Sequence, residues 1–267
     1  MIFALPFPAI DPVLVSIGPF VVRWYALAYI AGLVLGWRYM RALSAKPPVA
    51  AAPEDVDDFL LWATLGVVLG GRLGYVLFYR PDYYLANPLE ILAVWQGGMA
   101  FHGGILGVTV AGIAFVRKRK IAALPFADRL ACAAPLGLFF GRIANFINGE
   151  LWGRTADVPW AMVFPRGGPL ARHPSQLYQA ALEGLLLFVI LYVLQRRDSV
   201  RARPGLIAGV FIGGYGIARI LGEMFREPDA HIGLLVFGTT WGQWLSLPMV
   251  AIGAALIARA RRTKNAR

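Results

Sequence analysis

The sequence predicts an all-α integral membrane protein with about seven transmembrane helices. Of its 267 residues, 58% are hydrophobic and only 15% are charged, whereas a soluble domain carries about 25% charged residues. The mean hydropathy is +0.60. Apolar stretches of roughly 17–25 residues are long enough to cross a bilayer, and we expect seven of them, near residues 17–40, 59–79, 89–116, 124–141, 177–194, 205–223 and 241–260.

The basic residues predict the orientation of these helices. If the N-terminus is outside, the inner loops and the tail hold sixteen of the 26 basic residues, including every lysine. Because cytoplasmic loops are rich in Lys and Arg, we expect the N-terminus outside and the C-terminus inside. Inner loops that lie on anionic lipid then explain the net charge of +11, and no nucleic acid is expected as a partner.

The chain is expected to form a single membrane domain, residues 1–267. Three prolines in residues 1–16 disfavour a regular helix there, so this part is expected to lie on the outer surface. Residues 142–176 are expected to form an outer loop region, and residues 259–267 a basic cytoplasmic tail. The single cysteine, Cys132, excludes an internal disulfide and is expected to be a buried apolar residue.

Polar residues interrupt the first three apolar stretches. Arg23 and Tyr25 lie near the outer end of the first stretch. Arg72 lies among closely spaced glycines in the second; the glycines favour close helix packing, which does not account for the arginine. The third stretch is interrupted by Gly97-Gly98 and by His102-Gly103-Gly104. His102 is either a satisfied core histidine or part of a site, and broken helices at membrane depth are tolerated where they line a cavity.

The densest polar motif follows the fourth stretch, at residues 141–154. It places five polar side chains among glycines and large apolar residues: Arg142, Asn145, Asn148, Glu150 and Arg154. Ionisable groups at this depth are costly and usually mark a site.

The fifth and sixth stretches add further polar groups. The fifth opens with residues 173–178, and Glu183 lies further in. The sixth carries Tyr215, Arg219 and Glu223 at a spacing of four, so they share one helix face. A purely structural ion pair between Arg219 and Glu223 is an alternative to a site at this point.

The predicted topology brings these polar groups together in the outer half of the bilayer, around a central cavity that opens outward or laterally. Their surplus of arginine indicates an anionic ligand, because the planar guanidinium suits phosphate oxygens. A phosphate that enters such a cavity from the side is most simply a phospholipid headgroup. No metal-ligand spacing is present in the sequence, so no metal or cofactor is expected. The pattern favours a metal-free transfer with His102 as a base.

These motifs resemble the signature of prolipoprotein diacylglyceryl transferases. The resemblance covers nearly the whole chain and rests on residues 10–12, 23–25, 71–75, 102–104, 141–154, 173–178 and 215–223. Three positions depart from the usual pattern: Ala26 and Ala144 where Gly is common, and Gln179 where Glu is usual.

The resemblance implies an enzyme of the bacterial cytoplasmic (inner) membrane that performs the first step of lipoprotein maturation. Such an enzyme transfers the diacylglyceryl group of phosphatidylglycerol to the thiol of the lipobox cysteine in a preprolipoprotein signal peptide, and it releases glycerol 1-phosphate. The implied catalytic residues are His102, Arg142 and Arg219. The implied substrate-binding residues are Tyr25, Arg72, Asn145, Asn148, Glu150, Arg154, Tyr215 and Glu223.

Two other classes of protein remain open on the residues alone. A transporter for lipid or anionic solutes would also bury arginines and break helices. It predicts polar groups that reach the inner face, yet the inner halves of the expected helices are apolar apart from Arg72 and Arg129. A non-catalytic phospholipid-binding membrane protein predicts that substitution of His102 or Arg142 leaves function largely intact.

Overall fold

The computed structural model describes residues 5–8, 10–18, 20–228 and 233–265. It is mostly helical and forms two compact units. The first unit consists of Met1–Met40 and Ala127–Arg267, and the second is Arg41–Phe126.

Five helices in the described residues are long and apolar enough to cross a membrane: Pro53–Tyr79, Ala123–Ile147, Ser175–Gln195, Leu206–Glu223 and Trp241–Arg262. They correspond to the second, fourth, fifth, sixth and seventh expected stretches. The first and third stretches overlap α1 (Trp24–Ser44) and α4 (Phe101–Arg119). These two helices are not among the five, so the count of seven spans stays a prediction.

The expected helices at 17–40 and 89–116 begin later than predicted. Residues Phe20–Arg23 form strand β3, and residues 88–96 form two short 3-10 turns, η1 (Pro88–Leu92) and η2 (Val94–Gln96). Gly97 and Gly98 have φ values of 83° and 75°, which end any helix before α4. The break therefore lies at residues 97–100. The prediction that His102-Gly103-Gly104 interrupts the helix is wrong, because these residues are in the first turn of α4.

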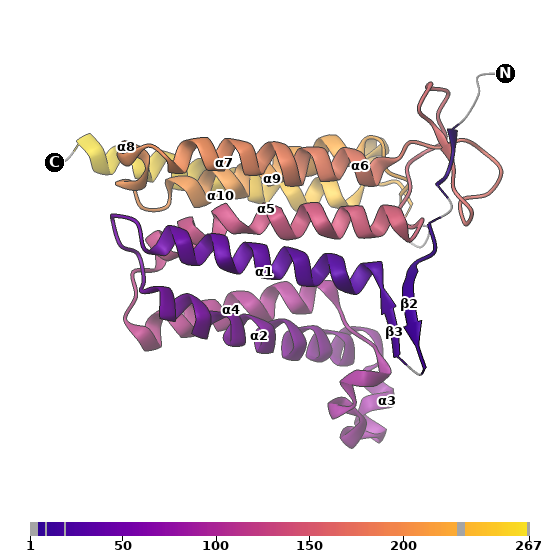
Figure 1. The fold of residues 1–267 in the computed structure, drawn as a ribbon, viewed down its shortest axis with the longest axis horizontal. Helices are drawn as coiled ribbons and strands as arrows, with labels where there is room; N and C mark the ends of the chain where they lie inside the picture. Colours follow the sequence, from indigo (N-terminus) through magenta and orange to yellow (C-terminus); the bar gives the residue numbers. More distant parts are fainter. Residues whose placement is uncertain (1–4, 9, 19, 229–232, 266–267) are drawn as a thin grey trace. The chain divides into compact units, whose positions relative to one another are not determined.

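In the first unit, long helices run side by side (Figure 1). They are α5 (Ala123–Ile147); the continuous helix of α6 (Ser175–Gln179), η3 (Ala180–Leu186) and α7 (Leu187–Gln195); α9 (Leu206–Glu223); and α10 (Trp241–Asn265). Glycines allow the backbones of α9 and α10 to touch: a Cβ on Gly253 would lie 2.5 Å from the backbone nitrogen of Gly213. The short elements α8 (Asp198–Arg201) and η4 (Val236–Gly238) connect these helices.

Short strands occupy one end of the first unit. β2 (Val13–Ile17) pairs with β3 in an antiparallel hairpin, and β1 (Leu5–Pro6) pairs in parallel with β4 (Met162–Val163). The described part of residues 1–16 is therefore not helical, as expected. Residues 1–4 and 9 of that segment, and residues 266–267 of the expected tail, lie outside the described residues.

The second unit is a pair of closely packed helices, α2 (Pro53–Tyr79) and α4, with the short helix α3 (Pro81–Ala86) and the two 3-10 turns at one end. A Cβ on Gly103 of α4 would lie 2.3 Å from the carbonyl oxygen of Gly70 on α2. This contact confirms the expectation that the glycines of α2 serve close packing. At the other end of the pair, Arg119 contacts the carboxylates of Asp55 and Asp58.

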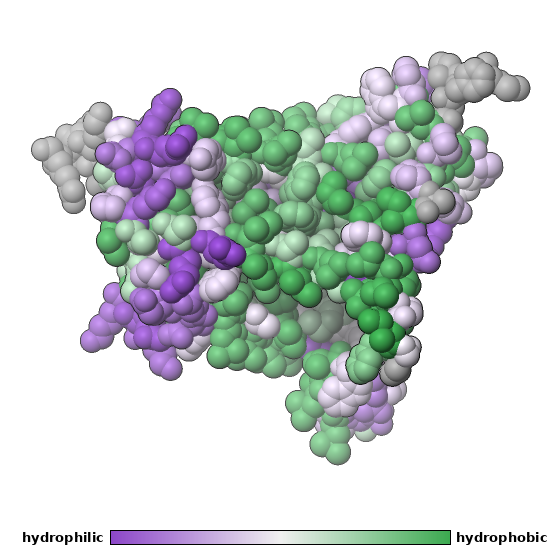
Figure 2. Space-filling view, viewed as in Figure 1, coloured by the Kyte–Doolittle hydropathy of each residue, from purple (hydrophilic) through white to green (hydrophobic). Residues whose placement is uncertain are grey.

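The surface of the first unit fits a lipid environment. Figure 2 shows hydrophobic residues over the middle of its long helices, and hydrophilic residues at the end where α8 and the C-terminal end of α10 lie. Only 11% of the apolar window in α10 is buried inside the protein. Such a large exposed apolar surface is typical of a face that contacts lipid tails.

Candidate functional site

Three charged side chains from three helices meet inside the first unit. Nε and Nη2 of Arg142, on α5, both donate hydrogen bonds to Oε2 of Glu183, at 3.1 and 3.0 Å. Nη1 of Arg219, on α9, lies 3.6 Å from Oε1 of the same carboxylate. The Glu183 side chain has no exposed surface, whereas each arginine retains 15%. One buried carboxylate thus holds the two arginines of separate helices beside each other.

A second carboxylate extends this arrangement. Nη2 of Arg219 lies 2.6 Å from Oε1 of Glu223, so the ion pair that the sequence offers as an alternative is present. Oε1 of Glu223 also accepts a hydrogen bond from Nη1 of Arg226 at 3.0 Å, and its Oε2 accepts one from the hydroxyl of Thr240 at 2.8 Å. We call the row Arg142–Glu183–Arg219–Glu223–Arg226 the charge row. Three arginines against two carboxylates leave it with one net positive charge.

The charge row retains unused hydrogen-bonding capacity. Nη1 of Arg219 and Oε1 of Glu183 are buried, and neither has a hydrogen-bond partner among the residues that the structure describes. The same is true of both amide atoms of Gln179, which is fully buried one turn before Glu183. Buried polar atoms are almost always paired in folded proteins. Two of these atoms, Nη1 of Arg219 and Oε1 of Glu183, face each other at 3.6 Å, so they form an ion pair without a hydrogen bond.

The helix that carries Glu183 is locally widened. Ala180–Leu186 forms a π-helical segment between α6 and α7, and such segments are frequent at functional sites. Gly184 lets this segment approach α5, because a Cβ on Gly184 would lie 2.6 Å from Cβ of Phe139. The close approach places Glu183 within reach of Arg142, which follows Phe139 by one turn.

Tyr215 joins the same group of residues. It lies one turn before Arg219 on α9, and its hydroxyl interacts with the guanidinium of Arg142 and faces the charges of Glu183 and Arg219. The structure therefore brings together four of the residues implied by the sequence: Arg142, Tyr215, Arg219 and Glu223.

A second polar cluster surrounds the end of α5. Nδ2 of Asn145, which is buried, donates to Oε1 of Glu150 at 2.8 Å. The hydroxyl of Tyr25, on α1, hydrogen-bonds the Asn145 side chain and lies 3.4 Å from the hydroxyl of Tyr29. The chain turns after α5 through Gly149 and Leu151, both with positive φ. Tyr25, Asn145 and Glu150 therefore form one hydrogen-bonded group.

Arg154 and Asn148 are placed differently. Nε of Arg154 donates to the carbonyl of Arg226 at 3.1 Å, and its backbone N–H donates to the carbonyl of Phe225 at 2.8 Å. These bonds join the segment after α5 to the segment after α9. Asn148 is half-buried, and its backbone N–H donates to the carbonyl of Ala144. Substrate binding by these two residues stays a prediction.

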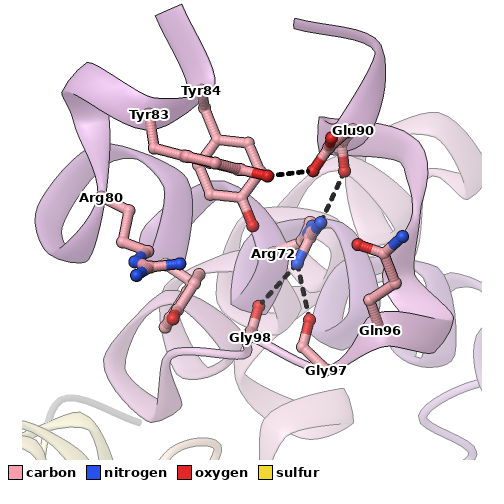
Figure 3. Close-up of a pocket in the computed structure, with 9 residues that line it drawn as sticks. Arg72, Arg80, Tyr83, Tyr84, Glu90, Gln96, Gly97 and Gly98 are labelled. Atoms are coloured by element: carbon pink, nitrogen blue, oxygen red, sulfur yellow. Dashed lines mark hydrogen bonds between the residues drawn. The ribbon is translucent and has the colours of Figure 1, made fainter. Parts of the chain in front are cut away.

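Arg72 lies in the second unit and is bound by backbone. Figure 3 shows its guanidinium among the turns that follow α3. Nε donates to the carbonyl of Ile91 and Nη2 to that of Glu90, while Nη1 reaches the carbonyls of Gly97 and Gly98. Arg72 is only 3% exposed. Its charge thus holds residues 88–98 against α2. These hydrogen bonds explain the presence of Arg72, which the packing role of the glycines does not.

His102 also belongs to the second unit. It is the second residue of α4, and its side chain is exposed. The structure thus places His102 in a different unit from Arg142 and Arg219, and its role as a base stays a prediction. No group of three or more His, Cys, Asp or Glu side chains in the described residues is placed to hold a metal ion.

Glu183 is the residue that the sequence reasoning did not assign to the site. An acidic residue within an apolar stretch was the available signal. The sequence does not identify the partners of Glu183, because residues 142, 183 and 219 are far apart along the chain. In the sequence, Gln179 shows only as a departure from the usual glutamate.

Comparison with known proteins gives one consistent result. Residues 12–259 match the family described as prolipoprotein diacylglyceryl transferase. Relatives named phosphatidylglycerol–prolipoprotein diacylglyceryl transferase include one from Paramagnetospirillum magneticum, 63% identical over 263 residues that make up 98% of each chain. A second, from Rhodospirillum rubrum, is 61% identical over 99% of this chain and 97% of the relative. A third, from Azospirillum brasilense, is 60% identical over 97% of each.

Proposed function

The chain belongs to the prolipoprotein diacylglyceryl transferase family, and we propose that it transfers the diacylglyceryl group of phosphatidylglycerol to the lipobox cysteine thiol of a preprolipoprotein signal peptide. The observation that carries the proposal at residue level is the pair of arginines held by Glu183. A net positive, partly buried pair of guanidinium groups suits a phosphate diester that enters from the membrane.

The reaction forms one bond and breaks one. The thiol sulfur bonds to the terminal glycerol carbon of the diacylglyceryl group, and the bond between that carbon and the phosphate oxygen breaks. The electron pair of the broken bond stays on the phosphate, so glycerol 1-phosphate leaves with an additional negative charge. Arg142 and Arg219 stabilise this charge as it develops, which is where preorganised donors contribute most.

The thiol must lose its proton during the transfer. We propose that His102 accepts this proton, because histidine is the side chain whose ordinary pKa suits a base near neutral pH. This assignment is supported by the sequence and by the family resemblance. The attacking sulfur belongs to the substrate, which agrees with a chain whose one cysteine, Cys132, is buried.

The other implied residues position the two substrates or the arginines. Tyr215 and Glu223 orient Arg219 and its neighbour Arg142. The cluster of Tyr25, Asn145 and Glu150 offers a hydroxyl, an amide and a carboxylate for the glycerol headgroup or the peptide backbone, with Asn148 and Arg154 beside it in sequence. We leave Arg72 out of the phosphate site, because its donors already bind four carbonyl groups.

We further propose the membrane arrangement that this function needs. The chain is one multi-pass domain in the bacterial cytoplasmic membrane, with seven spans, the N-terminus outside and the C-terminus inside. The charge row then lies in the outer half of the bilayer, where a signal peptide that has crossed the membrane presents its cysteine. Basic side chains near α8 and in α10 support an inner position for that end.

The test uses the purified full-length protein with phosphatidylglycerol and a lipobox peptide. Released glycerol phosphate and the mass gain of the peptide are measured for wild type, Arg142→Ala and His102→Gln, with Arg166→Ala as a control because Arg166 is an exposed arginine of the outer loop region. We expect turnover by wild type and by the control, and near-complete loss in Arg142→Ala. Equal activity in Arg142→Ala would contradict the phosphate site.

The same assay addresses the assignment of His102 and the reaction itself. Loss of turnover in His102→Gln supports a base at this position, whereas unchanged turnover refutes it. A peptide with serine in place of the lipobox cysteine gives no mass gain if the thiol is the acceptor. A folded wild type that binds phosphatidylglycerol but modifies no peptide would favour a transporter or a lipid-binding protein instead.

A further inference from the structure

The inner ends of α5 and α9 are joined by one buried carboxylate. Oδ2 of Asp128, on α5, accepts a hydrogen bond from the backbone N–H of Gly205, and Oδ1 accepts one from that of Ala208, both at 2.7 Å. Asp128 is only 5% exposed. The first N–H groups of a helix have no partner within the helix and are usually capped by the residue just before it. Here that residue is Gly205, with φ 86° and no side chain to cap with, so the cap of α9 comes from α5.

The position of this cap matches the position of the arginines. Arg142 follows Asp128 by fourteen residues (142 less 128), and Arg219 follows Gly205 by fourteen residues (219 less 205). At 1.5 Å per residue, each arginine lies about 21 Å along its helix from the same starting point. The two helices run parallel, because their beginnings meet at Asp128 and their far ends meet at Glu183. Figure 1 shows them running in the same direction.

We propose that Asp128 is a positioning residue for the transferase reaction, which fixes the axial register of α9 against α5 so that Arg142 and Arg219 reach Glu183 at the same depth. The inference rests on the proposed function. A slip of one residue at the capped end moves Arg219 by about 1.5 Å, which is enough to break a hydrogen bond. Misplacement of a catalytic group by about 1 Å can lower the rate about 100-fold.

A second connection between the helices lies at their far ends. The segments after α5 and α9 pair through Gly153 and Arg226. This pairing follows a turn with positive φ at Gly149 and Leu151, outside both helices, so it restrains the loops more directly than the helix axes. If the outer pairing alone sets the register, removal of the Asp128 cap leaves the reaction rate unchanged.

The experiment compares Asp128→Asn and Asp128→Glu with wild type as full-length protein in phosphatidylglycerol-containing nanodiscs. Asparagine keeps the shape of the side chain but turns an NH₂ group toward one of the two N–H donors. Glutamate keeps the charge and the cap but adds a methylene, which displaces α9. For both variants we expect kcat to fall about tenfold or more, while KM for the lipobox peptide changes less than about threefold, because Asp128 is only 5% exposed.

A control distinguishes positioning from general stability. Leu191→Ala removes a fully buried side chain of α7 in the same unit and is expected to lower the melting temperature without changing the register. Its kcat, measured below the melting temperature of every variant, should stay within about twofold of wild type because the charge row is intact. If Asp128→Asn fails to fold, the kcat of Asp128→Glu still tests the proposal.

A double-mutant cycle provides a readout that a merely structural role would not change. Asp128→Asn and Glu183→Gln act through the same pair of arginines, so their effects on kcat should be far from additive. An inactive wild type would refute the proposed function itself. With an active wild type, unchanged kcat in both Asp128 variants, additive effects with Glu183→Gln, or an equal kcat loss in Leu191→Ala would each overturn the role of Asp128.

Discussion

Glu183→Gln is the substitution that tests the charge row most directly. Glutamine has nearly the same shape as glutamate but no charge. In the native protein Oε2 of Glu183 accepts two hydrogen bonds from Arg142, and Oε1 lies 3.6 Å from Nη1 of Arg219. In the variant one of these oxygens becomes an NH₂ group that faces a guanidinium. Arg142 then faces a neutral acceptor, while Arg219 keeps Glu223 as its charged partner.

The magnitude follows from the burial of the three side chains. Removal of one partner from a buried ion pair costs about 3–5 kcal/mol of unfolding free energy. Because each arginine retains 15% exposure and gains some hydration, we expect the lower end, about 3 kcal/mol. For a chain of this size each kcal/mol corresponds to roughly 2–4 °C in melting temperature, so the variant should melt roughly 6–12 °C lower.

Activity should also fall, through a lower kcat and not through a higher KM. Without the carboxylate the arginines separate, and misplaced groups lower kcat by about 100-fold. The site is also more positive, so the KM for anionic phosphatidylglycerol should not rise. A lower kcat without a higher KM is typical of a lost interaction that acts mainly in the transition state.

Glu227→Gln is the matched control. Glu227 also pairs with an arginine, Arg172, at 3.1 Å, but its side chain is 45% exposed. Exposed pairs contribute less than about 1 kcal/mol, so this variant should melt and turn over nearly as wild type does. Unchanged melting temperature and kcat in Glu183→Gln would refute the reasoning, because the arginines would then be held by something other than this carboxylate.

Three further predictions test other parts of the structure. Arg72→Met leaves four backbone carbonyls of residues 88–98 without their donor, which costs about 1–3 kcal/mol for each buried group that stays unpaired. Limited proteolysis should therefore cut this segment faster than in Arg80→Met, a control at an exposed arginine. Equal cleavage of the two variants would contradict the structural role of Arg72. Gly153→Ala places a Cβ 2.5 Å from the carbonyl oxygen of Phe225 and should lower the free energy of unfolding by about 1–3 kcal/mol. The Cβ of Gly137→Ala meets nothing within 4 Å, so this control should be neutral or stabilising by up to about 1 kcal/mol. Thermal unfolding of both variants tests the difference. Burial lowers the pKa of His173 below its ordinary value of 6.5, so the folded state favours the neutral ring. The contribution of His173 to stability should be fully present above about pH 6.5 and decrease as the pH falls below it. The melting temperatures at pH 8 and pH 5 should therefore differ more for wild type than for His173→Gln, and an equal pH dependence would show that another group is responsible.

The sequence predicts most of the helices because lipid imposes a simple pattern. Apolar runs of sufficient length predicted all five of the helices in the described part of the chain that are long and apolar enough to span a membrane. The same pattern misplaced the start of two others. Residues 17–23 and 89–100 are apolar enough to resemble a span, yet Gly97 and Gly98 adopt positive φ and Phe20–Arg23 pair as a strand. Hydropathy measures the environment of a segment, whereas backbone pairing and glycine conformation decide where its helix begins.

The site was predictable in kind but not in its connections. Arginines in an apolar setting indicated an anionic ligand, and the spacing of four residues placed Arg219 and Glu223 on one helix face, where they form an ion pair. No local rule pairs Arg142 with Glu183, because their contact depends on a π-helical segment and on Gly184 approaching Phe139. Arg72 illustrates the converse. It carries the same charge in the same kind of helix, but its donors are consumed by carbonyls of a broken segment. A buried arginine therefore indicates a site only after its backbone partners have been counted.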